Sequence, residues 1–296
     1  EPDAHLEILR QRENYQLITE IARQHSSQII AASHSEVLLN EAADRDVVIA
    51  FVGAPHRIDD RGRQVLKALK EIGFEHYYQA ELRGWVLYVE GATDLAILRA
   101  FAAKLEHPAR VSLDSPFVHY VFNQPSKARD HFYGIREAKN DLVGFVLVDR
   151  IDGVLQDRAE LVERMWSRRE IENYLCQPET LMQYATDSAS EVGELFQAPE
   201  RERRRTAMED SINDLVPPVA LRNRDDPWWL NVKASDEFLD RLFASFFDRL
   251  KLPNLMRKTD YHSLAHYVRR EDIAPEVKAM LDAISDVASR AKPRIE

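Results

Sequence analysis

The sequence has one cysteine, no long apolar run and no signal peptide. Because Cys176 stands alone among 296 residues, the chain can form no internal disulfide, which fits a reducing compartment. No apolar segment reaches the length of a membrane-spanning helix, and the N-terminal residues lack the pattern of a secretory signal. These absences predict a cytoplasmic protein, and the length leaves room for two domains.

Two phosphate-binding motifs are also missing. The chain contains no GxxxxGK[ST] phosphate loop, so we do not expect it to bind or hydrolyse ATP by itself. No GxGxxG follows a predicted strand, which argues against a nicotinamide-dependent dehydrogenase. The net charge of -10 argues against binding a polyanion through bulk electrostatics, although carboxylates that hold divalent cations would contribute to this charge.

The middle of the chain alternates strand and helix patterns. Apolar, β-branched runs predict strands at 85–90, 117–122 and 142–148, and helical periodicity predicts helices at 94–105 and 126–140. Near-continuous apolar strands with helices between them are typical of a parallel sheet that is covered on both faces. We therefore expect an α/β fold with a Rossmann-like parallel sheet flanked by helices.

The two ends of the chain have other patterns. The N-terminal part predicts a helix at 8–22, strands at 28–32 and 46–52, a helix at 64–72 and a connector at 74–84. The C-terminal part predicts helices at 178–184, 236–250, 261–268 and 275–287. The C-terminal part is thus expected to be mainly helical.

Acidic residues stand at predicted strand ends or in a matching polar motif. They are Glu90, Asp94, Asp149, Asp152, Glu170 and Glu172. Magnesium prefers oxygen ligands, and two such cations can activate water and stabilise the leaving oxygen in phosphodiester cleavage. The same residues could instead be turn residues, helix caps or a solvated face of alternating charge. Their joint order favours a two-metal site.

Three segments carry a family resemblance. YVEGATDLAIL, VLVDRIDGV and WSRREIENYL resemble the signatures of a TOPRIM domain. The EIENYL form, joined behind part of an ABC-type ATPase, resembles the overcoming-lysogenization-defect (OLD) family of nucleases, which includes relatives in the Gabija phage-defence system. The resemblance implies that Glu90, Asp94, Asp149 and Glu172 hold two Mg²⁺ or Mn²⁺ ions, with Glu170 as the alternative to Glu172.

One spacing departs from the TOPRIM pattern. Most TOPRIM domains have DxD, whereas two residues separate Asp149 from Asp152. Beyond the end of a strand the chain is free to turn, so Asp152 is equally well explained as a metal ligand and as a turn residue.

The N-terminal segment resembles the distal half of an ABC-type ATPase head. EPDAHLE resembles the end of a Walker B motif that leads into the D-loop, and ASHS resembles the switch-histidine loop. The resemblance implies that Glu1 polarises the attacking water and that His34 senses the γ-phosphate, with ATP bound only in a full-length protein. The alternative is that His34 is a capping or core histidine. The start at Glu1, without Met, indicates an excised fragment.

The C-terminal part is expected to supply a cation. A positive charge near the scissile phosphate assists phosphoryl transfer, and the resemblance implies a lysine in this role. Lys258, in NLMRKTDYHSLAHYV, is the first candidate and Lys251 the second, with a surface lysine as the alternative for either. The ERERRR run, with Trp228 and Trp229, could bind phosphates and stack bases, or form a solvated helix face with core tryptophans.

These patterns divide the chain into four segments. The end of an ATPase domain occupies 1–73, a connector 74–84, the TOPRIM core 85–185, and a mainly helical part that completes the nuclease domain 186–296. The expected function is a metal-dependent DNA endonuclease that the ATPase regulates in the full-length protein. The resemblance implies a homodimer and a helicase-type partner. The alternatives are an ATP-gated nucleic-acid or nucleotide sensor with a non-cleaving TOPRIM domain, and an RNA-directed nuclease.

Overall fold

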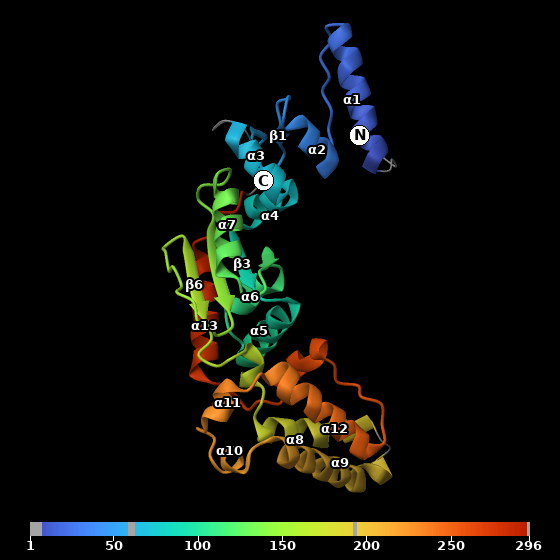
Figure 1. Ribbon diagram of the computed structural model, residues 1–296, viewed down its shortest axis with the longest axis vertical. Coiled ribbons are helices and arrows are strands. Elements are labelled where there is room, and N and C mark those ends of the chain that lie inside the picture. The colour runs from blue at the N-terminus through green and yellow to red at the C-terminus, as the bar shows by residue number, and fades with distance from the viewer. Residues whose placement is uncertain (1–7, 59–62, 192–193, 295–296) are drawn as a thin grey trace. The chain divides into compact units, whose positions relative to one another are not determined.

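The computed structural model describes residues 8–58, 63–191 and 194–294, which form two compact units (Figure 1). The first unit contains the described residues of 1–86, 129–143 and 291–296. The second unit contains those of 87–128 and 144–290. The chain therefore passes from one unit to the other more than once.

The first unit consists of short elements around a small apolar core. They are α1 (Ile8–Gln24), α2 (Glu36–Ala42), β1 (Ile49–Ala50), β2 (His56–Arg57), α3 (Arg63–Ile72) and α4 (Phe74–Arg83). Val65, Leu66 and Leu69 of α3 pack with Phe74 and Tyr77 of α4 in this core. The predicted helices at 8–22 and 64–72 are confirmed by α1 and α3.

The two strands predicted in the first unit are wrong in whole or in part. Residues 28–32, expected as a buried strand, have no regular structure, and Ile30 is 91% exposed. An extended segment becomes a strand only when another backbone satisfies its hydrogen bonds, and in the described residues none pairs with this one. The strand expected at 46–52 is limited to Ile49–Ala50, which pairs antiparallel with β2. The expected connector 74–84 is largely helix α4.

A parallel sheet of four strands has the order β4-β3-β5-β6. Its strands are β3 (Trp85–Val89), β4 (Val118–Tyr120), β5 (Val143–Val148) and β6 (Leu161–Met165). All five residues of β3 are buried, as are those of β5 from Gly144 onward. The mixed α/β class and the parallel sheet expected from the apolar runs are confirmed.

The sequence patterns do not predict the edge strand β6. It pairs in parallel with β5, and Gly144 lies opposite Leu161. Its sequence LVERM contains two charged residues, and only an edge strand tolerates charge inside so short a run. Glu163 is nonetheless buried. Its Oε2 accepts a hydrogen bond from the Gln156 backbone N–H at 2.8 Å, which offsets part of the cost of burying the carboxylate.

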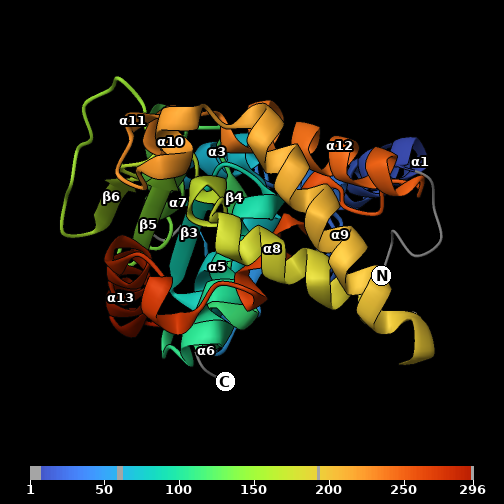
Figure 2. The same ribbon diagram turned by 90° about the horizontal axis from the view of Figure 1, so that it is seen from below.

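Helices pack on the sheet and on one another. α5 (Ala92–Leu105), α6 (Ala109–Asp114) and α13 (Pro275–Ser289) lie together on one side of the strands (Figure 2). α7 (Pro125–Arg136) follows β4 along the chain. The helices predicted at 94–105, 126–140 and 275–287 correspond to α5, α7 and α13.

A helical region follows the sheet. Its elements are the 3-10 helices η1 (Ile171–Tyr174), η2 (Ser188–Glu191), η4 (Lys258–His266) and η5 (Arg270–Asp272), the π-helical segment η3 (Ala234–Leu239), and the α-helices α8 (Pro178–Asp187), α9 (Glu194–Leu215), α10 (Pro218–Arg222), α11 (Pro227–Asn231) and α12 (Asp240–Leu250). α8 and α12 pack against α9, and an aromatic core of Tyr184, Phe243 and Tyr261 lies among the helices. The α-helix predicted at 236–250 instead begins as a π-helix, and the segment predicted at 261–268 is 3-10 rather than α. Among the described residues, no helix combines the length and the apolar character needed to cross a bilayer.

A buried ionic cluster fixes the first unit. Glu81 of α4 is 1% exposed, and its Oε2 accepts from Lys139 Nζ at 3.4 Å and Arg294 Nε at 2.9 Å. Lys139 Nζ also donates to the Lys292 backbone carbonyl at 3.0 Å. Since a buried charge is costly without partners, these contacts bind three distant stretches of chain to one another.

We predict that Lys139→Met destabilises the first unit by about 3 kcal/mol, because it leaves the buried Glu81 carboxylate with fewer partners. Hydrogen exchange of the α4 backbone amides measures this local unfolding free energy. Lys70→Met is the matched control, because Lys70 pairs with Asp44 at the surface and exposed pairs contribute little. Equal protection of α4 in both variants would contradict the prediction.

Candidate metal centre

Three carboxylates meet at the carboxyl edge of the parallel sheet. Glu90 follows β3 and Asp149 follows β5, so neighbouring parallel strands deliver both side chains to the same edge. Asp94 joins them from the first turn of α5. One carboxylate oxygen from each residue lies within 4.8 Å of those of the other two. The fold thus brings together acids from two separate sequence motifs.

Asp94 is also a helix cap. Its Oδ2 accepts a hydrogen bond from the Gly91 backbone N–H at 3.0 Å, which fixes the turn between β3 and α5. This bond occupies only part of the acceptor capacity of a carboxylate. The capping role therefore holds Asp94 in place and leaves it available to a cation.

Asn123 connects the other two acids. Its Nδ2 donates to Asp149 Oδ2 at 3.1 Å and also to Glu90, and its Oδ1 accepts the Asp149 backbone N–H at 2.9 Å. Phe122 and Asn123 have φ angles of 48° and 57°, a conformation that is unfavourable for residues other than glycine. The sequence patterns above do not single out Asn123. Its place just after a predicted strand, like that of Glu90, is the signal that could have identified it.

Burial and crowding raise the pKa values of Asp94 and Asp149. Burial and then the charge of Glu90 raise the pKa of Asp94 to about 6. The pKa of Asp149 is also raised, by burial, by its contact with Glu90 and by the charge of Asp94. Glu90 therefore opposes ionisation of Asp94, and both oppose ionisation of Asp149.

One carboxylate oxygen of Asp149 indicates whether a cation fits between the three close acids. Asp149 is 9% exposed, and in the part of the chain that the structure describes its buried Oδ1 has no hydrogen-bond partner. A buried acceptor without a partner calls for an explanation, and a bound ion is one. Three carboxylates with oxygens this close offer the hard ligands that Mg²⁺ or Mn²⁺ requires. The donor set therefore fits a divalent cation.

Glu172 lies outside the group of three close acids, but its charge interacts with that of Asp94. It is buried in η1, and burial followed by the charge of Asp94 raises its pKa to about 8. Glu170 is buried too, but its Oε2 accepts the Ser235 backbone N–H at 2.9 Å and so holds the start of η3. These contacts favour Glu172 over Glu170 as a ligand.

Asp152 lies outside the cluster. Its side chain is exposed in the turn after β5, and the group of close acids in the described chain consists of Glu90, Asp94 and Asp149. The turn-residue interpretation therefore explains Asp152 better than a place among the ligands does.

Lys258 brings a positive charge to the acids. Its charge lowers the pKa of Asp94 and that of Glu172, against the larger effect of burial. Burial lowers the pKa of Lys258 itself, but the charges of Asp236 and Glu172 more than offset this, so that the value is raised and the ammonium group stays charged. Lys251 is exposed at the end of α12 and has no such role.

The expected ATP-site residues are only partly described. Glu1 lies outside the described residues. His34 is exposed before α2, where Ser35 caps the helix by accepting the Leu38 backbone N–H at 3.5 Å. The structure therefore assigns the capping role to Ser35, and His34 is not a core residue.

The basic run has partners within the protein. Arg204 is buried and its Nε lies 2.9 Å from Glu200 Oε1, which also accepts from Arg203. Trp229 is buried, and its Nε1 donates to the Ala220 carbonyl at 2.9 Å. These contacts favour a helix face with core tryptophans over a base-stacking surface.

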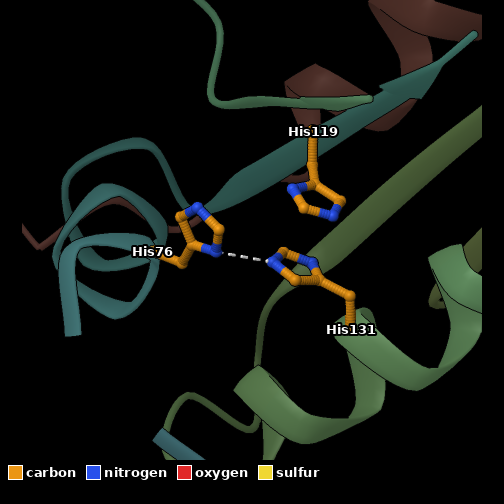
Figure 3. Close-up of side chains that lie close together, drawn as sticks. All are labelled: His76, His119 and His131. Atoms are coloured by element: carbon orange, nitrogen blue, oxygen red, sulfur yellow. Dashed lines mark hydrogen bonds between the residues drawn. The ribbon is translucent and has the colours of Figure 1, made fainter. Parts of the chain in front are cut away.

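A histidine pair lies in the first unit. His76 of α4 and His131 of α7 are hydrogen bonded through Nδ1 and Nε2, which are 2.9 Å apart (Figure 3). Burial lowers the pKa of His76, so its neutral form is favoured at neutral pH. The bond ties α4 to α7.

Comparison with protein families, with curated proteins and with solved structures finds no match to this chain.

We predict that the protein binds Mn²⁺ more tightly as the pH rises from about 6 to about 8. Protons compete with the cation for Asp94 and Glu172, whose pKa values are raised to about 6 and about 8. Folding favours the protonated acids, so the metal-free protein loses stability as the pH rises through these values, and Mn²⁺ restores it. Calorimetric titration measures the affinity, and thermal unfolding measures the stability.

We predict that Asp149→Asn weakens Mn²⁺ binding by about tenfold or more, because it removes a charged ligand from the cluster. Asp152→Asn is the matched control, since it makes the same chemical change in the same motif at an exposed position outside the group. Equal losses in the two variants would place the cation elsewhere.

Proposed function

We propose that the protein is a metal-dependent endonuclease that hydrolyses phosphodiester bonds in DNA. The observation that supports this proposal most is the meeting of Glu90, Asp94 and Asp149 at the carboxyl edge of the sheet, with a buried Asp149 oxygen that lacks a partner. The choice of DNA and of the OLD-type TOPRIM class rests on the resemblance of the sequence motifs.

The acidic residues and the lysine of the site would have different roles. Glu90, Asp94 and Asp149 would hold Mg²⁺ or Mn²⁺. Glu172, which is buried and interacts electrostatically with Asp94, would add a further carboxylate. A bound divalent cation supplies stabilisation of charge on phosphate oxygens and activation of water. Lys258, charged and near Asp94 and Glu172, would attract and orient the anionic substrate. Asn123 would keep Glu90 and Asp149 in position through its amide.

The regulatory part of the proposal concerns the first unit. Among the described residues, α1 has no buried side chain, and Ile8, Leu9 and Leu17 are each more than half exposed. Apolar exposure of this extent favours a surface that is covered in the full-length protein. The remainder of an ABC-type ATPase domain would cover it, bind ATP and form the homodimer.

A sensor function without cleavage is the second candidate. The exposed position of Asp152, away from the close acids, favours it, because the TOPRIM pattern expects a second aspartate after this strand. A sensor would bind nucleic acid or nucleotide and release no product.

We predict that the protein nicks supercoiled plasmid in the presence of Mn²⁺ or Mg²⁺. Asp149→Asn should slow nicking by about a hundredfold or more, because loss of a ligand removes several kcal/mol of stabilisation. Asp152→Asn should cut like the unaltered protein. Gel electrophoresis separates supercoiled, nicked and linear forms, and an RNA strand of the same sequence tests the RNA-directed alternative.

The substitution Lys258→Ala tests the role of the ammonium group separately from metal binding. We expect it to slow nicking while leaving Mn²⁺ affinity within a few-fold, because the ammonium group acts on the substrate rather than on the cation. Plasmid binding without any nicking by the unaltered protein would favour the sensor instead.

A further inference from the structure

A polar cavity of about 380 Å³ lies in the second unit, apart from the three close acids. It is lined by residues around the start of α8 and by the segments before α11 and around η5. Three arginines line it, Arg168, Arg224 and Arg269, together with the buried Trp229. Its volume falls within the range of cavities that hold small ligands.

Arg168 is held in place without an acidic partner. Its Nη1 donates to the Asn173 carbonyl at 2.8 Å, and its guanidinium lies 4.6 Å from the centre of the Tyr174 ring. Among the described residues Arg168 forms no ion pair, and its side chain is half-buried. A guanidinium that is oriented in advance and keeps free donors is suited to bind a phosphate through two parallel hydrogen bonds.

The other two arginines have partners that a ligand can replace. Arg224 pairs with Glu179 at 2.5 Å, and Arg269 pairs with Asp272 at 2.5 Å. Arg224, Glu179 and Arg269 have side chains that are about half exposed or more, and the Asp272 side chain is 32% exposed. Exposed pairs of this kind contribute little free energy. A phosphate that enters the cavity can therefore recruit one or both guanidinium groups at small cost.

The acidic residues of the lining narrow the class of ligand. Asp225, Glu179 and Asp272 give the lining as many acids as arginines. Glu179 and Asp272 pair with Arg224 and Arg269, so a phosphate that takes either guanidinium group frees a carboxylate to accept hydrogen bonds from the same ligand. Such a lining disfavours a bare polyanion and favours a ligand that carries both an anion and hydrogen-bond donors. A nucleotide has this pattern, because its phosphate is anionic and its base can carry an amino group.

We propose that this cavity binds a nucleotide, with the phosphate on Arg168 and the amino group of the base toward the acids. The nucleotide can come from a free mononucleotide or from the 5′ end of a nucleic-acid strand. Binding here would act close to the candidate metal centre, because Arg168 holds the carbonyl of Asn173 and Cys176 of the lining donates to the carbonyl of Glu172. The proposal does not depend on nuclease activity.

Calorimetric titration without metal tests the proposal, with AMP and with a short single-stranded oligonucleotide that carries or lacks a 5′-phosphate. We expect AMP to bind, and Arg168→Gln to weaken its binding by about tenfold or more, as loss of a charge-assisted bidentate contact does. Binding of the 5′-phosphorylated strand alone, with the same dependence on Arg168, would identify the strand end as the source.

Two further variants make the outcome decisive. Arg269→Gln changes an exposed side chain, so it should fold normally and weaken AMP binding even where Arg168→Gln disturbs the turn. Arg205→Gln is the matched control, because Arg205 is exposed on α9 and pairs with Glu202 away from the lining. Absence of binding at millimolar concentrations, or equal affinity in all three variants, would overturn the proposal whether or not the protein cuts DNA.

Discussion

Repulsion between carboxylates at the edge of the parallel sheet is the constraint on which the candidate site depends. Glu90, Asp94 and Asp149 have oxygens within 4.8 Å of one another, and the charge of Glu90 raises the cost of ionising both Asp94 and Asp149. A protein that needed only a stable sheet edge would gain nothing from this grouping. The fold instead supports it with an amide at Asn123, a helix cap at Asp94 and a nearby ammonium at Lys258.

Much of the sheet and of the candidate site could be predicted from the sequence. Buried parallel strands leave long apolar runs, so β3 and β5 were recognisable, and an acid directly after each run has to lie at the same edge. Asp94 was recognisable because it follows within the first turn of the next helix. These inferences need only local patterns and the geometry of a parallel sheet.

Other features depend on contacts that the local sequence does not record. The strand expected at 28–32 is absent because its backbone finds no neighbour among the described residues, whereas β6 forms at the edge of the sheet despite two charged residues. The role of Asn123 becomes clear only from its bonds to Glu90 and Asp149, which are distant in sequence. The contrast between Glu170 and Glu172 likewise depends on Ser235, which lies far along the chain.

The ionic cluster at Glu81 has a consequence for the order of folding. Glu81 and Arg294 are 213 residues apart in sequence, and Lys139 is supplied from a third stretch of the chain. A ribosome therefore exposes α4 long before the last partner of its buried carboxylate has been synthesised. The ionic cluster of the first unit can therefore be completed only after the residues of the second unit, which lie between these partners, have been synthesised.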